Sequence, residues 1–217
     1  MEKEFWLGKW ERHEIGFHQP EYNPFLVKKW QEFTHKYPMA KTSVFVPLCG
    51  KSLDMLFLVE QGYKVIGVEL SAIACEEFFS ENNIDYTIEK LENFTLYNSE
   101  NISLYCGDMF NMHTEMLKDV GYVYDRASLI ALPHEMRLRY VDFMESNLIG
   151  AKVFLVVLDF DNTEVGPPHS ITEGMVESYF SNHYKISSIA EVNIPLEKFG
   201  KHKDKITQVS NKLYWLS

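Results

Sequence analysis

The stretch VFVPLCGKSLDMLFLVEQGYKVIGVEL, residues 44–70, decides the fold class. It begins with an apolar, β-branched run, turns at Gly50, and continues with apolar residues at helical spacing over 52–61. Gly62 follows where a helix commonly ends, and YKVIGVEL over 63–70 is typical of a buried strand. A strand, a helix and a second strand in this order predict a βαβ unit with two parallel strands.

The same alternation of strands and helices continues along the rest of the chain. Further strands are expected over 102–106, 121–124 and 152–158, and further helices over 72–82, 133–148 and 172–181. The last two strands, 184–194 and 209–216, follow each other without a helix, which indicates an antiparallel pair. With the strand at 43–47, these elements predict an α/β, Rossmann-like fold: a mainly parallel seven-stranded sheet with helices on both faces and a C-terminal antiparallel strand.

The charge balance argues against polyanionic partners. Thirty-one acidic and 21 basic residues give a formal net charge of −10 at pH 7, so the chain repels phosphate backbones and no nucleic acid partner is expected. The densest basic stretch, residues 198–205, is interrupted by aromatic, glycine and acidic residues. We interpret it as a solvated loop.

Cysteine usage and hydropathy indicate a cytoplasmic protein. Cys49, Cys75 and Cys106 are odd in number and widely spaced, which fits neither a disulfide framework nor a zinc ribbon. The eight histidines form no metal-binding pattern, so no metal site is expected. The longest aliphatic run, residues 153–158, is too short to span a bilayer, and MEKEFWLGKW at the N-terminus lacks the apolar core of a signal peptide.

Residues with chemical potential follow four of the predicted strands, where ligands bind in open α/β sheets. Gly50 lets the backbone approach a ligand at a helix N-terminus. Glu69 lies about 20 residues further on, the spacing at which an acid accepts hydrogen bonds from ribose hydroxyls. Asp108 could accept from an adenine amine while Met109 packs on the ring, and Arg126 could orient an anion. The alternatives are an exposed acid at 69, an Asx turn at 108, and a surface pair of Arg126 with its neighbour Asp125.

The same pattern leaves other functions open. A ribose-binding acid also fits a nicotinamide-dependent oxidoreductase, but the G-x-G-x-x-G motif is missing after the first strand. Lys51-Ser52 does not make a phosphate-binding loop, because the first glycine of that motif is absent. A non-catalytic binding protein on the same fold is the remaining alternative, since fold alone does not prove activity.

Aromatic residues gather near the N-terminus. Phe5, Trp6 and Trp10 stand at helical spacing, and Gly16-Phe17-His18-Gln19-Pro20 follows them. Such a stripe commonly belongs to the core, but its position before the first strand also suits a lid. We expect one domain over residues 1–217, with residues 1–40 as an N-terminal helical lid over the cofactor site.

Five stretches together resemble one family. They are FWLGKWERHEIGFHQP (5–20), the opening stretch 44–70, NISLYCGDMF (101–110), VYDRASLIAL (123–132) and the Gly-Pro-Pro loop 166–168. The chain resembles the thiopurine S-methyltransferases, in their bacterial form, over nearly its whole length. The resemblance implies the Rossmann-like fold of class I methyltransferases.

The resemblance also implies a reaction and its participants. S-adenosyl-L-methionine would give its methyl group to the sulfur of an aromatic or heterocyclic thiol, a small molecule, and leave as S-adenosyl-L-homocysteine. Bacterial members are also associated with the methylation of selenium and tellurium compounds. In the family, residues matching Trp10, Leu48, Glu69 and Arg126 contact the cofactor, those matching Asp108 and Met109 lie by the adenine, and the one matching Phe17 lies at the substrate mouth. Two departures concern fine preference: Tyr124 replaces a common Trp, and Gly200 or Lys201 falls where the family has an arginine.

The chemistry of a thiol acceptor suggests roles for residues on the substrate side. Heterocyclic thiols ionise readily, so Arg126 is expected to orient an anion while Phe17 stacks on its ring. His18 could accept a proton directly or through water, or be purely structural. The rigid Gly-Pro-Pro loop, through Pro168, is expected to close one wall of the pocket. Cys49 has no partner base, so a covalent role is not expected, and a monomer is expected because no amphipathic element is left unassigned.

Overall fold

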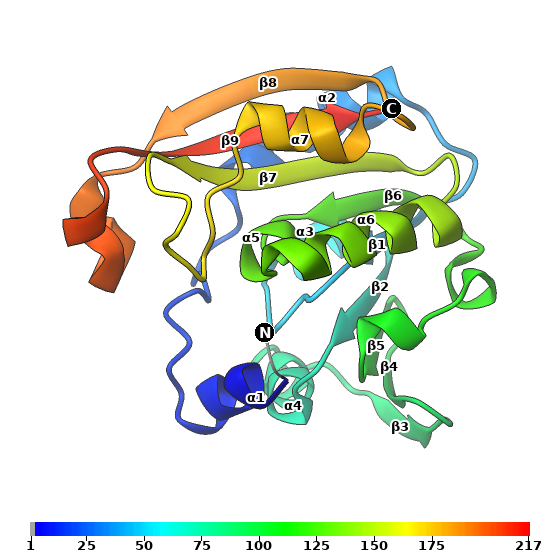
Figure 1. Ribbon diagram of the computed structural model, residues 1–217. Helices are drawn as coiled ribbons and strands as arrows, with labels where there is room; N and C mark the ends of the chain where they lie inside the picture. Colours follow the sequence, from blue (N-terminus) through cyan, green and yellow to red (C-terminus); the bar gives the residue numbers. More distant parts are fainter. Residues whose placement is uncertain (1–2) are drawn as a thin grey trace. The chain divides into compact units, whose positions relative to one another are not determined.

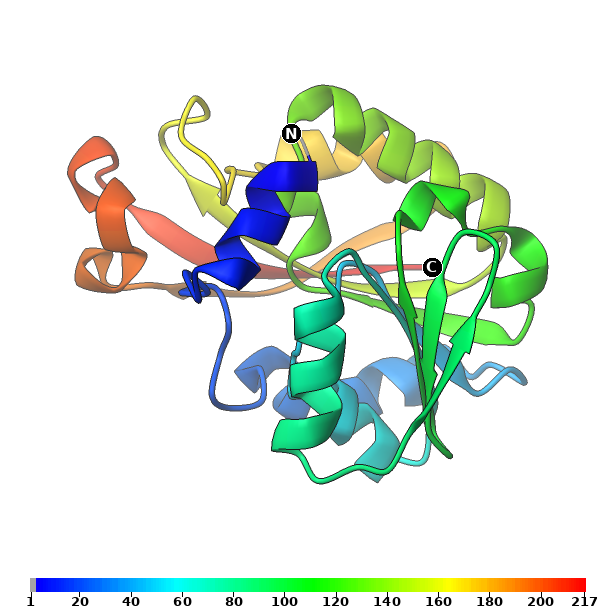
Figure 2. The same cartoon turned by 90° about the horizontal axis from the view of Figure 1, so that it is seen from below.

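The structure, a computed structural model, describes residues 3–217, apart from the side chains of Lys198, Gly200 and Lys201. The last two of these are the positions where the resemblance lacks a family arginine, so that comparison lies outside the described residues. The chain forms two compact units, residues 1–123 and residues 124–217. Figure 1 labels their elements, and Figure 2 shows the same ribbon from below.

The first unit combines six strands with four helices among the described residues. Its helices are α1 (Lys3–Glu11), α2 (Pro24–Lys36), α3 (Asp54–Glu60) and α4 (Ala72–Glu81), followed by two 3₁₀ turns, η1 (Met109–Asn111) and η2 (Thr114–Leu117). Its strands are β1 (Ser43–Val46), β2 (Lys64–Glu69), β3 (Thr87–Lys90), β4 (Thr95–Asn98), β5 (Ile102–Cys106) and β6 (Val120–Asp125), whose last two residues belong to the second unit.

The sheet of the first unit has the predicted parallel centre. Its strand order is β3-β4-β5-β2-β1-β6, in which β5, β2, β1 and β6 run parallel. The register places Glu69, the last residue of β2, opposite Cys106 at the end of β5. The carboxyl ends of these strands therefore lie at one edge, where the sequence predicts the ligand site.

Two strands of this sheet were not predicted. β3 and β4 form an antiparallel hairpin that adds to β5 at the edge of the sheet. All four residues of β3, TIEK, are exposed, so the strand has no buried face and shows no alternation of apolar and polar residues. The seven predicted strands each hold at least partly buried apolar side chains, whereas a fully exposed edge strand gives no such signal.

An aromatic cluster packs α2 against the strands of the first unit. The ring of Trp30 lies 5.5 to 5.7 Å, between centroids, from those of Phe33, Tyr63 and Tyr122. The Tyr122 hydroxyl donates to the Tyr37 carbonyl at 2.9 Å and accepts from the Met39 amide at 3.0 Å. These contacts join the end of α2 to β6 and make residues 24–39 part of the core rather than a loose extension.

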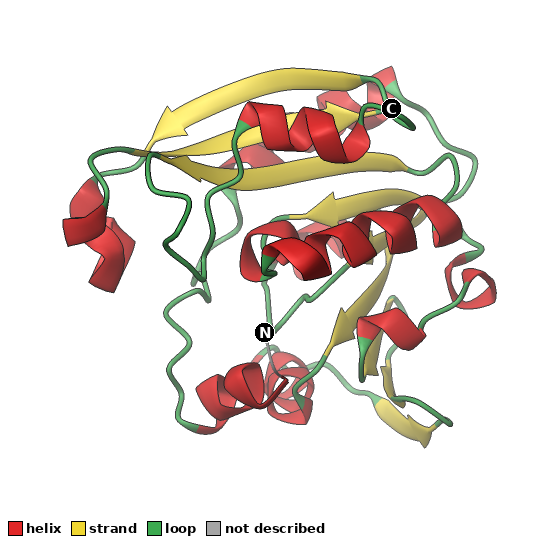
Figure 3. Cartoon of the chain, in the orientation of Figure 1, coloured by secondary structure: helices red, strands yellow, loops and turns green. Residues whose placement is uncertain are grey.

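The second unit is an antiparallel three-stranded sheet with helices. Its strands, β7 (Lys152–Phe160), β8 (Ile186–Asn193) and β9 (Val209–Leu216), lie in the order β7-β9-β8, with both neighbouring pairs antiparallel. Its helices are α5 (Ser128–Ala131), α6 (His134–Asn147) and α7 (Glu173–Phe180). The predicted C-terminal antiparallel strands are confirmed, and Figure 3 shows residues 161–172 between β7 and α7 as loop.

Several helices begin at a polar capping residue or end at a glycine. Ser71 caps α4 by accepting from the Ala74 amide at 3.4 Å, and Thr172 caps α7 by accepting from the Met175 amide at 3.3 Å. Gly62 and Gly150 follow α3 and α6 with φ of +87° and +78°. This left-handed conformation suits glycine and ends each helix as expected.

The interpretation of residues 198–205 as a solvated loop is wrong. Residues Leu196–Lys205 form a 3₁₀ helix, η3. Leu196 and Phe199 both pack against the buried cluster of Phe160, Val165, Ile206 and Val209. Because side chains three residues apart share one side of a 3₁₀ helix, two apolar anchors in a basic stretch are enough to order it.

Among residues 3–217, no helix combines the length and the apolar character that crossing a bilayer requires.

We predict that Trp30→Ala destabilises the protein by about 3–5 kcal/mol, the usual cost of deleting a buried aromatic ring. Trp30 is 1% exposed and touches three other rings, so the cavity cannot be filled by small movements. Urea unfolding followed by circular dichroism measures the change. Ile149→Ala is the control, because Ile149 is 83% exposed and its loss should change the free energy of unfolding by less than about 0.5 kcal/mol. Equal effects of the two substitutions would contradict the assignment of Trp30 to the core.

Candidate functional site

The loop after β1 has an unusual backbone. Leu48 and Gly50 have φ of +45° and +52°, in the left-handed region. For Leu48, which is not glycine, this conformation costs about 1–2 kcal/mol. The loop is held at Cys49, whose amide donates to the Val68 carbonyl at 3.0 Å. Strain of this kind at a predicted cofactor residue marks the loop as a functional candidate.

Trp10 explains why position 50 must be small. A Cβ atom built on Gly50 would lie 3.2 Å from the Trp10 ring. Trp10 itself is buried, and its helix α1 contacts α4. The first unit thus brings together two predicted cofactor residues, one from the N-terminal helix and one from the loop after β1.

Glu69 is the polar centre of this edge of the sheet. Its side chain is buried, and its two carboxylate oxygens accept from two backbone amides, Oε2 from Gly50 and Oε1 from Ser71, each at 2.9 Å. Burial raises the pKa of Glu69, and the bonds from Ser71 and Gly50 pull it back down. An ionised carboxylate has about four acceptor positions, so two remain for hydroxyl donors. The alternative of an exposed acid at this position is wrong.

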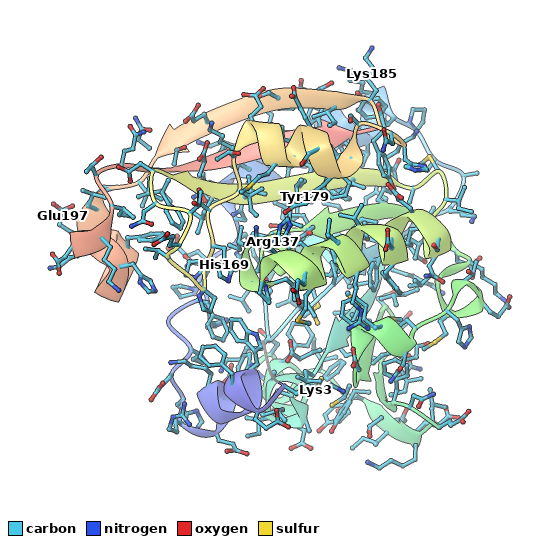
Figure 4. All side chains as sticks on the ribbon, in the orientation of Figure 1. Lys3, Arg137, His169, Tyr179, Lys185 and Glu197 are labelled. Atoms are coloured by element: carbon cyan, nitrogen blue, oxygen red, sulfur yellow. The ribbon has the colours of Figure 1, made fainter. Side chains whose placement is uncertain are left out.

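Asp108 has two partners in the first unit. Its Oδ1 accepts from the Phe110 amide at 3.1 Å, which forms the Asx turn that the sequence left as an alternative. Its Oδ2 lies 2.9 Å from Nζ of Lys3 on α1, a residue marked in Figure 4. The neighbouring Met109 is buried. Contact of either residue with adenine stays a prediction.

Phe17 and His18 lie beyond α1. Phe17 is 42% exposed, and its ring meets those of Trp6 and Trp10 edge-on with centroids 5.6 Å apart. An exposed ring held by two others is available for stacking, as the substrate role requires. His18 is half-buried and its amide donates to the Ile15 carbonyl at 2.8 Å. Nothing in these contacts tests its suggested role as a proton acceptor.

Lys51 is already engaged by carboxylates. Its Nζ atom lies 2.8 Å from Glu77 and 2.7 Å from Glu81, and its side chain is buried. A lysine neutralised by two acids is a poor phosphate ligand. This agrees with the sequence analysis, which gives Lys51-Ser52 no phosphate-binding role.

The three cysteines converge, although they are far apart in sequence. Cys49 follows β1 and Cys106 ends β5, and both strands flank β2. The Cys106 thiol donates to the Leu70 carbonyl at 3.7 Å, and the neighbouring Cys75 lowers the pKa of Cys106. Burial raises the pKa of Cys49 well above its ordinary value, which supports the absence of a covalent role. Within residues 3–217, no group of His, Cys, Asp and Glu side chains is arranged to hold a metal ion.

In the second unit, a buried carboxylate supports the position of Arg126. The side chain of Asp125 accepts from the Ser128 amide at 3.0 Å and from the Tyr140 hydroxyl at 2.6 Å. Burial raises the pKa of Asp125, and the Tyr140 hydrogen bond opposes that shift. Arg126 follows directly and is half-buried. Asp125 therefore belongs to the core, and the alternative of an Asp–Arg pair on the surface is wrong.

Pro168 lies on the long loop of the second unit. Gly166-Pro167 and Pro167-Pro168 are both cis peptide bonds. A Cβ atom on Gly166 would collide with the ring of His169, and the His169 amide donates to the Ile130 carbonyl at 2.7 Å. The loop is thereby fixed to the end of α5. His169 was not identified from the sequence, although it directly follows the Gly-Pro-Pro motif.

Comparisons with known proteins cover the whole chain. The family model described as thiopurine S-methyltransferase matches residues 1–217. A thiopurine S-methyltransferase of Shewanella baltica (strain OS155 / ATCC BAA-1091) is 43% identical over 196 residues, which are 89% of this chain and 88% of the relative. One from Pseudomonas fluorescens (strain SBW25) is 38% identical over 218 residues, covering 100% of this chain and 99% of the relative.

A solved structure supports the fold. The magnesium protoporphyrin IX methyltransferase of Synechocystis PCC 6803 superposes with a TM-score of 0.63, covering 99% of both chains at 11% identity. That likeness shows a Rossmann-like methyltransferase fold with a parallel core and antiparallel C-terminal strands. Sequence identity near 40% from end to end is far more specific, and it shows that the chain belongs to the thiopurine S-methyltransferase family.

Proposed function

We propose that this chain transfers the methyl group of S-adenosyl-L-methionine to the sulfur of aromatic and heterocyclic thiols, thiopurines among them. Family membership gives the reaction class. The observation in the structure that carries the proposal is the buried Glu69 carboxylate, bonded to the Gly50 amide at the end of β2. The nicotinamide alternative has no comparable support, since the chain lacks its glycine motif and matches a methyltransferase family over its whole length.

The residues of the first unit fit S-adenosyl-L-methionine. Glu69 keeps acceptor positions for ribose hydroxyls, and Leu48 and Gly50 present backbone groups from a loop shaped for close approach. Trp10 and Met109 offer apolar surface, and Asp108 would accept from the adenine amine. When bound, the cofactor supplies an electrophilic methyl group on a sulfonium and leaves as S-adenosyl-L-homocysteine. Of the lid expected over residues 1–40, the part before α2 would cover this site, because residues 24–39 belong to the core.

Arg126 and Phe17 would serve the acceptor. Arg126 provides a fixed positive charge that orients a thiolate, and Phe17 provides an aromatic face for its ring. His18 and Pro168 would contribute to the walls of the pocket. Because a thiolate is already a strong nucleophile, these residues would act mainly by positioning it in line with the methyl group.

The first experiment is calorimetric titration with S-adenosyl-L-homocysteine, followed by turnover with 6-mercaptopurine. Micromolar binding and a methylated product support the proposal. Binding without turnover of any thiol would favour the non-catalytic alternative, and absence of binding would overturn the assignments of Glu69 and Gly50.

We predict that Glu69→Gln weakens S-adenosyl-L-homocysteine binding by about 10- to 100-fold, because a hydrogen bond to a charged group is worth about 1.5–3 kcal/mol. Calorimetric titration measures the affinity, and thermal unfolding tests whether the loop around Gly50 survives. Glu89→Gln, on the exposed strand β3, is the matched control and should bind as the wild type does. A folded Glu69→Gln variant with unchanged affinity would remove Glu69 from the ribose site.

We predict that Arg126→Ala lowers kcat/KM for 6-mercaptopurine by about 100-fold, the usual cost of misplacing a reacting group by about 1 Å. Steady-state kinetics measure this loss, and titration with S-adenosyl-L-homocysteine separates a cofactor role from an acceptor role. Arg139→Ala removes an exposed guanidinium from α6 and should leave both measurements unchanged. Wild-type values of kcat and KM in Arg126→Ala would exclude Arg126 from the mechanism.

A further inference from the structure

His169 carries a ring nitrogen that no group satisfies. Its Nε2 atom is buried and has no hydrogen-bond partner among residues 3–217. Leaving a buried polar atom unpaired destabilises the folded protein. Among the described residues, the other side-chain atoms of this kind are those of Trp30, His202, Tyr214 and Trp215, and among them and His169, His169 alone directly follows the Gly-Pro-Pro loop.

The other ring nitrogen of His169 faces the backbone. A Cβ atom on Gly166 would collide with Nδ1, so this nitrogen lies directly against the chain at that glycine. Nε2 is the ring nitrogen that lacks a partner, so it is the one left for a ligand. In the tautomer with the proton on Nδ1, Nε2 presents a lone pair.

Arg137 places a positive charge near this ring. Residue Arg137 is 5% exposed, and its Nε atom donates to the Leu132 carbonyl at 2.7 Å. The His169 amide donates to the Ile130 carbonyl, so two carbonyls at the end of α5 hold the two residues in place. Figure 4 labels both residues. In the described part of the chain, no carboxylate pairs with Arg137. His169 and the cation of Arg137 therefore lie on neighbouring segments of the second unit.

The electrostatics keep His169 uncharged. Burial lowers the pKa of its imidazole, the Arg137 guanidinium lowers it further, and the bond to Val165 acts in the opposite direction. A neutral imidazole with a bare Nε2 can accept a proton, whereas an imidazolium cannot. The environment therefore preserves the form of histidine that works as a base.

We propose that His169 is a catalytic base for acceptors that arrive as neutral thiols, with Nε2 as the atom that takes the thiol proton and Arg137 as the charge that steadies the sulfur. His169 directly follows Pro168, the loop residue expected to line the acceptor pocket. This inference rests on the proposed methyl transfer and adds a route for weakly acidic thiols. It also assigns the proton that the sequence left between His18 and water.

The S–H bond of the acceptor breaks and its proton passes to Nε2, which gives an imidazolium. The freed sulfur lone pair forms the new S–CH₃ bond. The bond between that methyl group and the sulfonium breaks, and its electron pair stays on the sulfur of the departing thioether. The imidazolium then returns its proton to water, and the repulsion from Arg137 favours that release.

The test compares acceptors of different acidity. Wild type, His169→Gln and the control His183→Gln are assayed with ring-substituted thiophenols and an alkyl thiol across a pH series. His183 belongs to the second unit and pairs with Glu145 at the surface, so its loss should change nothing. For thiols that are protonated at the assay pH, we predict that His169→Gln lowers kcat by about 100- to 10,000-fold, and that raising the pH restores much of the rate. For thiols already ionised, the loss should be below about threefold.

A second readout does not depend on turnover. Nitrogen-15 NMR of the His169 ring, in the complex with S-adenosyl-L-homocysteine, should show the Nδ1–H tautomer, and the alkyl thiol, which is protonated at neutral pH, should shift the Nε2 resonance. A proton on Nε2, or a resonance that the alkyl thiol leaves unmoved, would overturn the proposal.

The outcomes separate this inference from the proposed function. If wild type methylates thiols and His169→Gln keeps the same dependence on thiol acidity, the base is not His169 and methyl transfer stands. If wild type methylates no thiol at all, the proposed function fails first, and the NMR result alone then decides whether His169 contacts an acceptor.

Discussion

The carboxylate of Glu69 holds the predicted cofactor edge together. Its two oxygens bind the amides of Gly50 and Ser71, so one side chain fixes the loop after β1 and the start of α4 at the same time. The left-handed backbone at Leu48 and Gly50 depends on that anchoring, because a free loop would relax to ordinary φ values. Trp10 can then pack on the bare glycine. The predicted binding surface is thus a consequence of one buried charge and its two amide donors.

In the second unit, a buried carboxylate likewise fixes the turn at the end of β6. Asp125 is buried and binds an amide and a tyrosine hydroxyl, which fixes the turn that carries Arg126. A buried carboxylate without such donors would be strongly destabilising, and with them it holds its loop in one conformation. In both units, therefore, the residue proposed to touch a ligand stands in or next to a turn that a buried acid has already made rigid.

The sequence predicted those parts of the molecule that bury side chains in a regular pattern. The parallel strands and the glycine that ends α3 follow from periodicity and residue preference, and the spacing from Gly50 indicated an acid at the end of β2. The hairpin β3-β4 was missed because an exposed edge strand needs no apolar face. The convergence of Cys75 and Cys106 and the environment of His169 depend on long-range packing, which no local pattern encodes.

In the proposed methyl transfer, a fixed cation would orient an ionised acceptor, and a neutral base would take the proton of a neutral one. An acceptor that arrives ionised needs only orientation, which a guanidinium supplies without any change of protonation state. An acceptor that arrives as a neutral thiol must lose a proton as the bond forms, and only a group that is uncharged beforehand can take it. Placing Arg137 near His169 serves both stages, because the charge that keeps the imidazole neutral also stabilises the thiolate that its action creates. The range of acceptors would then be set by the electrostatics of the second unit, while the first unit would set the affinity for the methyl donor.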